Sequence, residues 1–279
     1  MRIATYNVKN FFDSLDPHRS KPESEVKALA TTIDRFKPDI LGLQEVESED
    51  SLEELNDLLD TKFRYRELIE GNSYRDINVA FMSHKQINMT SHKGLSLTGP
   101  DGKTLYDYPD KRAYKKKKKE RLKFQRDLVL AEFSLGGGKR LAVWNMHLKS
   151  RSSRKFNALK PDEIRWAEAN KAESLIEAYA DKHPNHPIVV LGDLNQTHGH
   201  KSIRPLIKGL GYFDPVLEEQ VKKGKAVTTY WKKKRDRIDY VLLSPTAESA
   251  YEAKSAKVYT GKTAQKASDH YAVYVDLDL

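Results

Sequence analysis

Polar side chains that could perform chemistry stand beside short runs of Val, Ile and Leu, where predicted strands end or begin. Carboxylates, amides and imidazoles at consecutive strand ends indicate an active site, because a sheet holds such groups rigidly. Each of them alone has an ordinary structural interpretation, since a single Asn is commonly a turn residue. Their joint occurrence along the chain is therefore what indicates a site. The residues are Asn7, Glu45, His147, Asp193, Asn195, Asp239, Asp269 and His270.

The strands that would position these groups are predicted from segments rich in Val, Ile, Leu and aromatic residues, with turn residues at both ends. In the last segment Val273, Val275 and Leu277 alternate with Tyr274 and Asp276, which predicts one buried face. The predicted strands are residues 2–8, 39–46, 76–83, 127–135, 140–148, 188–194, 238–244, 251–259 and 271–279.

Helical periodicity occurs between some of these strands. Residues 22–36 have apolar side chains at helical spacing and a proline at their start, which predicts an amphipathic helix. Ser51 and Glu54 resemble a capping box at the start of a second helix. Residues 162–182 are predicted to form the longest helix. Its predicted inward stripe is Leu175, Ile176 and Tyr179.

No internal repeat or linker divides the chain, and strands and helices alternate along all of it. The sequence therefore predicts a single α/β domain over residues 1–279, with sheets packed together and helices outside. Residues 202–208 are predicted to form a short helix. The glycines at 136–138 predict a hairpin turn between two adjacent antiparallel strands.

The composition excludes several classes of protein. The chain has no cysteine, so disulfides, zinc-thiolate sites, iron–sulfur clusters and a cysteine nucleophile are excluded. No run of about 18 apolar residues predicts a membrane span. The first residues lack the apolar region of a signal peptide, so we expect a secreted or periplasmic location if a signal was trimmed and a cytoplasmic one otherwise. We expect a monomer.

Charge is unevenly distributed along the chain, whose net formal charge is +9. Residues 1–100 contain 13 basic and 17 acidic residues, whereas residues 101–279 contain 36 and 23. Residues 111–126 alone hold ten Lys or Arg and one acid, and predict a mobile basic loop at about residues 100–125. Such asymmetry favours a polyanionic partner, either nucleic acid or an anionic membrane surface, over a role in solubility alone. The lysine run also imitates a nuclear localisation signal.

Six short motifs, in this order and spread over nearly the whole chain, resemble those of the endonuclease/exonuclease/phosphatase superfamily, the metal-dependent phosphodiesterases related to pancreatic-type deoxyribonuclease. Each motif alone is weak, but the ordered set is specific. The resemblance implies a four-layered α/β/β/α sandwich with the active site at one edge of its two sheets. The motifs are TYNV at residues 5–8, LQEV at 43–46, NMHL at 145–148, GDLN at 192–195, RIDY at 237–240 and SDH at 268–270.

The metal site implied by this resemblance centres on Glu45, assisted by Asn7 and Asp269. Carboxylate and amide oxygens suit Mg²⁺, and Mn²⁺ could take its place. Zinc fits less well, because the chain has neither cysteine nor a cluster of three histidines.

Hydrolysis of a phosphodiester needs an activated water and neutralisation of the phosphate charge. His270 is expected to act as a general base or, when protonated, as a phosphate ligand, with Asp239 orienting its ring. Asp193 and Asn195 are two apart and would face the same phosphate, Asp193 orienting or deprotonating the water. His147 would be the second imidazole, donating to the phosphate or to the leaving group.

Other residues are expected to contact the substrate or to support the site. Arg126 resembles a phosphate-contacting arginine of deoxyribonuclease-like members, and Lys149 follows the second imidazole. Trp231 matches the family's habit of placing an aromatic residue there, either as core packing or as a base-stacking platform. Asp76 is the candidate carboxylate supporting His147, although it could equally be a surface turn residue.

The superfamily spans several substrate classes, and a fold does not choose among them. The basic second half favours a long polyanion, so we expect a DNA endonuclease of low sequence specificity acting on double-stranded DNA. The alternative is a phosphodiesterase or phosphatase acting on lipid head groups, of the sphingomyelinase or phosphoinositide phosphatase type. A third interpretation, an inactive binding protein, is disfavoured by the intact set of candidate residues.

Overall fold

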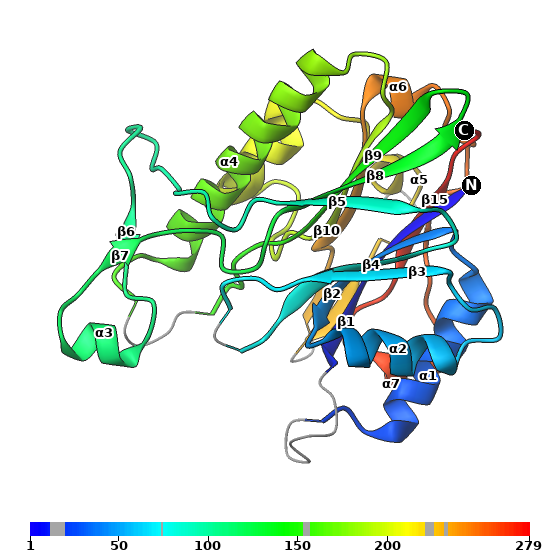
Figure 1. Ribbon diagram of the computed structural model, residues 1–279, viewed down its shortest axis with the longest axis horizontal. Coiled ribbons are helices and arrows are strands. Elements are labelled where there is room, and N and C mark those ends of the chain that lie inside the picture. The colour runs from blue at the N-terminus through cyan, green and yellow to red at the C-terminus, as the bar shows by residue number, and fades with distance from the viewer. Residues whose placement is uncertain (12–19, 74, 153–156, 221–225, 232–233) are drawn as a thin grey trace.

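Two β-sheets form the centre of the molecule (Figure 1). The computed structural model describes residues 1–11, 20–73, 75–152, 157–220, 226–231 and 234–279. The first sheet has six strands in the order β14-β15-β1-β2-β4-β3, and β1 is parallel to β2 and antiparallel to β15. Both ends of the chain therefore lie in one sheet. Its strands are β1 Arg2–Phe11, β2 Ile40–Val46, β3 Tyr65–Ile69, β4 Asn78–Ser83, β14 Lys257–Val258 and β15 Val273–Asp276.

The second sheet has five strands in the order β13-β10-β9-β8-β5, in which β9 and β10 are parallel. The β8–β9 connection confirms the predicted hairpin, because Gly136, Gly137 and Gly138 all adopt positive φ there. Its strands are β5 Ile87–Ser91, β8 Val129–Gly136, β9 Lys139–His147, β10 Ile188–Asp193 and β13 Asp239–Leu243.

The main core lies between the two sheets. Alternate residues of their strands meet there, including Ile3, Phe81, Val143, Val189 and Val275, all fully buried or nearly so. Burying one face of each strand fixes the register, because a slip of one residue would expose the whole apolar set. The predicted inner face of the last strand is confirmed, since Val273, Val275 and Leu277 belong to this core.

Helices cover the outer faces of both sheets, which gives the expected four-layered α/β/β/α arrangement (Figure 1). On the first sheet, α1 (Glu23–Phe36) and α2 (Glu49–Asp57) bury a second apolar cluster. On the second sheet, α4 (Pro161–Lys182) buries a third. The shorter helices are α5 Pro215–Glu219, α6 Pro245–Glu248, α7 Lys262–Ala267, a 3₁₀ turn at Lys201–Ile203 and a π turn at Pro205–Gly209.

Two helix details differ from the prediction. The N-cap of α2 is Ser48, whose hydroxyl accepts from the Ser51 amide at 3.1 Å, so the predicted capping box at Ser51 is wrong. On α4, Ile176 is buried as expected, but the buried face also contains alanines and extends back to Ile164. Small side chains let this helix lie close to the sheet, which a search for large apolar residues overlooks.

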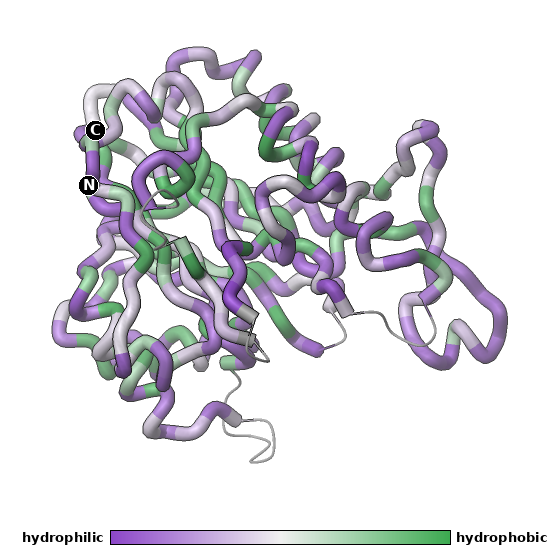
Figure 2. Tube along the Cα trace, turned by 180° about the vertical axis from the view of Figure 1, so that it is seen from behind, coloured by the Kyte–Doolittle hydropathy of each residue, from purple (hydrophilic) through white to green (hydrophobic). Residues whose placement is uncertain are grey.

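Residues 95–125, called the arm below, project beyond the ends of the sheets (Figure 1). The arm contains β6 (Tyr106–Asp107), α3 (Lys111–Lys115) and β7 (Glu120–Arg121), with β6 and β7 paired antiparallel. The segment predicted as a mobile basic loop thus contains short paired strands and a short helix, and its mobility stays a prediction. Figure 2 shows that the region around α3 is hydrophilic, whereas the hydrophobic segments lie mainly in the strands.

The remaining differences concern short or marginal strands. The predicted strand over residues 251–259 is reduced to β14 and an isolated bridge at Tyr251. A hairpin of β11 (Thr229–Trp231) and β12 (Lys234–Asp236) was not predicted, nor were the edge strands β3 and β5. None of the helices in the described residues combines the length and apolar composition that a membrane span requires.

Candidate active site

Strand direction brings the predicted polar residues to one edge of the two sheets. The carboxyl ends of the parallel pairs β1–β2 and β9–β10 carry Asn7, Glu45, His147 and Asp193. Asp239 opens β13 opposite Asp193, because these two strands are antiparallel. His270 precedes β15, which runs antiparallel to β1. A cavity of about 450 Å³ opens at this edge. It is lined by Lys9, Asn10, Glu45, Arg75, Arg126, His147, Ser150, Arg151, Ser152, Asp193, Asn195, Thr229, Asp236, Ile238, Asp269 and His270.

Unusual backbone conformations point several of these side chains into the cavity. Glu45 has φ +67° and lies where the β2–β4 register shifts, which is a bulge that redirects a side chain. Asn195 has φ +55°. Gly192 has φ +135°, and a Cβ placed there would lie 1.9 Å from the Met146 carbonyl oxygen. Backbone strain of this kind persists where surrounding structure enforces it, typically at functional sites.

A buried amide network joins the two sheets directly beneath the cavity. The Gln44 amide donates to Asn145 Oδ1 at 2.8 Å and to Thr5 Oγ1 at 2.9 Å. The Asn145 amide donates to the Leu43 and Ala80 carbonyls, each at 3.1 Å. All these polar groups are buried, and a bonded network of this kind fixes one sheet relative to the other.

Asn7 bridges the two carboxylates nearest the sheet junction. Its Nδ2 lies 3.0 Å from Asp193 Oδ2 and 3.4 Å from Glu45 Oε1. Glu45 Oε2 accepts from the Asn10 amide at 2.8 Å, which leaves Oε1 facing Asn7 and His147. The structure thus brings Asn7 and Glu45 together as expected. Asp269, the third predicted metal residue, is half-buried and lines the same cavity.

Asp239 and His270 form a buried carboxylate–imidazole pair. His270 Nδ1 lies 3.0 Å and 3.1 Å from the two Asp239 oxygens, and its Nε2 lies 3.9 Å from Asp193 Oδ2. Burial would lower the pKa of His270, but the charges of Asp239, Asp193 and Asp269 raise it to about 10. Burial and the neighbouring Asp239 raise the pKa of Asp193 to about 7. At neutral pH His270 is therefore charged, with Nδ1–H donating to Asp239.

His147 differs from His270 in its surroundings. Its Nε2 lies 3.5 Å from Asp193 Oδ2 and 3.9 Å from Glu45 Oε1. Burial, and then the positive charge of Arg126, lower the pKa of His147 well below its ordinary value, so the ring is neutral at pH 7. Its Nδ1 is buried without a hydrogen-bond partner among the described residues. Asp76 is exposed and has φ +54°, and the structure does not bring it to this nitrogen.

Arginine side chains supply the positive charge of the cavity. Arg126 lines it while 7% exposed, as the sequence predicted for a phosphate contact. Burial lowers the pKa of Arg126. Glu168 of α4, which is 1% exposed, opposes this shift because its negative charge favours the charged guanidinium. Arg75 and Arg151 also line the cavity. Arg75 was not predicted, because it lies in a loop outside every motif.

One predicted substrate contact, Lys149, is placed differently, and the side chain of another, Trp231, is not described. Lys149 is buried, and its Nζ donates to the Ser152 carbonyl at 2.7 Å and to Ser150 Oγ at 3.3 Å. It is absent from the cavity lining and holds the turn that carries Ser150 and Ser152 into it. Trp231 ends β11, but its side chain lies outside the described residues. Asn195 donates to Asp193 Oδ2 and to the Leu148 carbonyl, each at 3.1 Å, and lies beside Asp193 as expected.

The donor groups fit a hard divalent cation. The carboxylates of Glu45 and Asp193 converge on the side-chain amide of Asn7, and carboxylate oxygens are donors that Mg²⁺ and Mn²⁺ prefer. Ligand atoms of Asp193, Asp239 and His270 also lie within 4.8 Å of one another. A cation there would compete with the proton that His270 shares with Asp239, so the Glu45 side is the better place.

Comparisons with known proteins agree with this architecture. A family model described as the Endonuclease/Exonuclease/phosphatase family matches residues 4–270. No curated protein sequence matches at a significant level.

Among solved structures, the catalytic domain of human Nocturnin with a bound sulfate anion has a TM-score of 0.66 at 17% identity, covering 99% of this chain and 93% of that chain. A mannosyl-6-phosphatase from Bacteroides thetaiotaomicron has 0.62 at 17%, covering 100% of both chains. Truncated TDP2 from Caenorhabditis elegans has 0.61 at 16%, covering 98% and 96%. These similarities show a shared fold. Because the family model spans nearly the whole chain, the chain belongs to the Endonuclease/Exonuclease/phosphatase family, whose members are metal-dependent phosphoesterases.

Proposed function

We propose that the chain is a Mg²⁺-dependent nuclease, a DNA endonuclease of low sequence specificity that hydrolyses phosphodiester bonds. The observation that carries this proposal is the composition of one cavity. Two imidazoles and four buried or half-buried carboxylates line it together with Arg75, Arg126 and Arg151. Such a cavity combines groups that move protons with groups that bind phosphate oxygens.

Each residue near the reacting phosphate has a role that follows from its contacts. Asp239 holds the His270 ring with Nε2 toward Asp193 and the cavity, so His270 can donate to a phosphate oxygen. Asp193 accepts from the Asn195 amide and lies between both imidazoles, so it can orient the attacking water and take its proton. His147 Nε2 lies on the other side of Asp193 and can donate a hydrogen bond to the leaving oxygen.

Glu45 and Asn7 would hold the divalent cation, with Asp269 at the same cavity. When bound, the cation supplies positive charge beside the phosphate and polarises it. Arg126 would bind a non-bridging oxygen, and burial strengthens that contact because little water competes with it.

The location of positive charge supports a nucleic acid as the substrate. Arg126 lies directly after the arm, and residues 111–126 carry ten basic residues against one acid. A phosphoester of a small molecule would be bound by the arginines of the cavity alone. A polyanion that continues beyond the cavity would also meet the arm. Low sequence specificity is part of the proposal because contacts to phosphates carry no sequence information.

To test the proposal, the purified protein is incubated with Mg²⁺ and, in parallel reactions, with supercoiled plasmid, RNA, a phosphoinositide or sphingomyelin. We expect relaxed circles before linear plasmid, and then fragments without a fixed pattern. The matched His270→Ala protein should leave the plasmid intact. Hydrolysis of either lipid with intact plasmid would overturn the proposal in favour of a lipid phosphoesterase.

A further inference from the structure

In the part of the chain whose burial is described, exposed aromatic side chains are confined to the arm and the β11–β12 hairpin. Among the described residues, the exposed aromatic side chains are Tyr106 (46% exposed) and Tyr114 (48%) on the arm, and Tyr230 (38%) on the β11–β12 hairpin. Every other aromatic ring whose burial is described is at least partly buried. Leaving a large ring in water is common for single residues, but this grouping requires an explanation.

The root of the arm is firmly attached to the domain. Asp107 is buried and accepts from the Asn157 amide at 2.5 Å and from the Ala158 backbone at 2.7 Å. Leu97 and Leu122 are buried in the apolar cluster on the outer face of the second sheet. Within the arm, the Leu97 amide donates to the Leu122 carbonyl, the Leu122 amide to Leu105 and the Leu105 amide to Leu97. A segment anchored by buried apolar and hydrogen-bonded groups presents its outer side chains in fixed positions.

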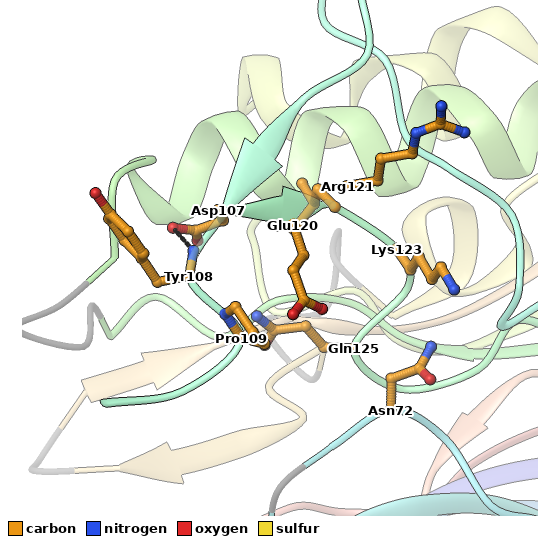
Figure 3. Close-up of a pocket in the computed structure, with 9 residues that line it drawn as sticks. Asn72, Asp107, Tyr108, Pro109, Glu120, Arg121, Lys123 and Gln125 are labelled. Atoms are coloured by element: carbon orange, nitrogen blue, oxygen red, sulfur yellow. Dashed lines mark hydrogen bonds between the residues drawn. The ribbon is translucent and has the colours of Figure 1, made fainter. Parts of the chain in front are cut away.

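Strand pairing in the arm orients one tyrosine outward beside a cation. Asp107 pairs with Glu120 across β6 and β7, and Tyr106 pairs with Arg121. Since neighbouring residues of a strand point to opposite faces, Tyr106 and Arg121 share the face opposite to buried Asp107. Figure 3 shows the Arg121 side chain pointing away from that of Glu120.

The second tyrosine belongs to a small cluster on the arm. The Tyr114 ring lies edge-on to Tyr108, with the ring centroids 5.3 Å apart. Lys119 Nζ lies 5.5 Å from the centroid of the Tyr108 ring. The Lys and Arg residues at positions 111–123 are all exposed. Residues 111–126 hold 10 of the 49 basic and 1 of the 40 acidic residues. The rest of the chain has 39 basic and 39 acidic residues, so the net charge of +9 comes from this segment.

Both projections adjoin the cavity. The arm ends at Gln125, and the next residue, Arg126, lines the cavity. A second cavity, of about 300 Å³, lies at the arm root between Asp107, Tyr108, Lys123 and Gln125 (Figure 3).

On the hairpin, Thr229 and Asp236 line the catalytic cavity, and the Arg235 guanidinium lies 5.1 Å from the Tyr230 ring centroid. A strand leaving the reacting phosphate therefore meets tyrosines flanked by cations on either projection.

Building on the proposed function, we propose that the arm and the β11–β12 hairpin bind a single-stranded segment of nucleic acid beside the cleaved bond. Bases stack on Tyr106, Tyr114 and Tyr230, and the neighbouring Lys and Arg side chains neutralise the phosphates. Stacking rings interleaved with cations are how proteins hold single strands without reading sequence.

A single strand fits these features better than a duplex. In a duplex the faces of the bases are covered by their neighbours, so an exposed ring could reach a base face only by wedging between base pairs. The wedges that do this are apolar, whereas the exposed rings here are tyrosines set among lysines and arginines.

The test measures binding in EDTA, which separates binding from hydrolysis. Full-length protein is titrated with a fluorescent oligothymidylate, a duplex of the same length and anionic vesicles, each at several salt concentrations. The variants are Tyr106→Ala/Tyr114→Ala, Tyr230→Ala and the aromatic replacement Tyr106→Phe/Tyr114→Phe. Leu58→Ala, at an exposed apolar residue beside α2, is the matched control. Thermal unfolding checks that each variant is folded.

We expect each alanine replacement to weaken binding of the oligothymidylate by about 5- to 150-fold per stacked base, the equivalent of ~1–3 kcal/mol. The salt dependence should stay unchanged, because no charge is removed. The phenylalanine variant and Leu58→Ala should bind like the unmodified protein, and duplex affinity should not change.

Unchanged oligothymidylate affinity in the alanine variants would overturn the proposal, as would an equal loss on the duplex or a loss confined to vesicles. Plasmid nicking in Mg²⁺ is scored separately. Tyrosine-dependent binding without any nicking would reject the proposed nuclease activity and leave the single-strand site standing.

Discussion

The cavity and the arm are adjacent regions that differ in how far their charged groups are exposed to water. In the cavity and directly behind it, ionisable groups such as Asp193, Asp239 and Arg126 are almost completely removed from water. On the arm, the cations of residues 111–123 are all exposed to it. Burial strengthens each electrostatic contact in the cavity and shifts the pKa values of the groups that make it. Exposure makes each electrostatic contact of the arm weak and dependent on salt.

This difference implies that the cavity carries out hydrolysis and that the arm contributes to substrate binding. Pairs such as Asp239–His270 work through fixed short distances, which need strand ends and a bonded network beneath them. If the proposed nucleic-acid binding holds, the arm works through the sum of many weak attractions, so no single lysine is decisive. Changes in the cavity should therefore act on the rate of hydrolysis, and changes in the arm on affinity.

Removal of the divalent cation should have the largest effect. We expect EDTA to abolish hydrolysis completely and Mg²⁺ or Mn²⁺ to restore it, since the converging carboxylates of Glu45 and Asp193 offer oxygen donors for such a cation. Oligonucleotide binding by the arm should survive the same treatment. Plasmid nicking and fluorescence anisotropy in one buffer series measure both, and undiminished nicking in EDTA would contradict the assigned chemistry.

Replacing either imidazole should give the next largest effect. His270→Ala and His147→Ala should each lower kcat by about 10²–10⁴-fold, the usual contribution of a general acid or base. KM should change little, because the arm and the arginines are intact. His183→Ala, at the end of α4, is the control. Single-turnover kinetics give the comparison, and a variant that turns over normally would show that its imidazole has another role.

Neutralising the lysine run should change binding rather than the rate of hydrolysis, which is the opposite of the effect expected for the two histidines. Replacing Lys115 through Lys119 by Gln should raise KM and flatten the slope of log K against log salt on duplex DNA. The slope should fall by up to about 0.9 for each of these lysines that neutralises a phosphate in the unmodified protein. The effect should fall on KM rather than kcat.

The control for the lysine run replaces Lys27, Lys37 and Lys62, which are exposed near α1 and α2. Titrations at several salt concentrations measure the slope for both proteins. A slope that stays the same after the run is neutralised would leave the run as a solvated surface.

The smallest effect is expected at Asp76. Asp76→Asn should leave kcat and KM unchanged within error, because the side chain is exposed and does not line the cavity. Steady-state kinetics beside His147→Ala measure this. A reduction in kcat comparable to that of His147→Ala would mean that the carboxylate reaches His147 during the reaction.

The elements that the sequence predicted best have both a strong apolar pattern and a neighbour on each side. β1, β2, β9 and β10 are interior strands whose runs of Val, Ile and Leu are visible in the chain. The edge strand β3 was missed because all its positions are half-buried, so it has no alternation. Ser48 and Ser51 both suit an N-cap, and only the backbone geometry distinguishes them.

The site was predictable where local motifs coincide with strand ends, as at Asn7, Glu45, Asp193 and His270. Arg75 could not be found, because a surface arginine in a loop has no local signal. Glu168 lies on a charged stretch of α4 that reads as a solvated face, and it is buried only because Arg126 and the backbone of Lys149 meet it.

By itself the sequence determined the identity of the reactive groups and the layers that hold them, because strand periodicity and turn chemistry are local properties. Tertiary structure alone decided how those groups behave. It left His147 neutral, because burial and then Arg126 lower the pKa of that imidazole, and it left His270 charged, because Asp239 and Asp193 outweigh burial there. It also turned a lysine-rich stretch into an anchored arm, since buried Asp107 and Leu122 find their partners only in the folded chain.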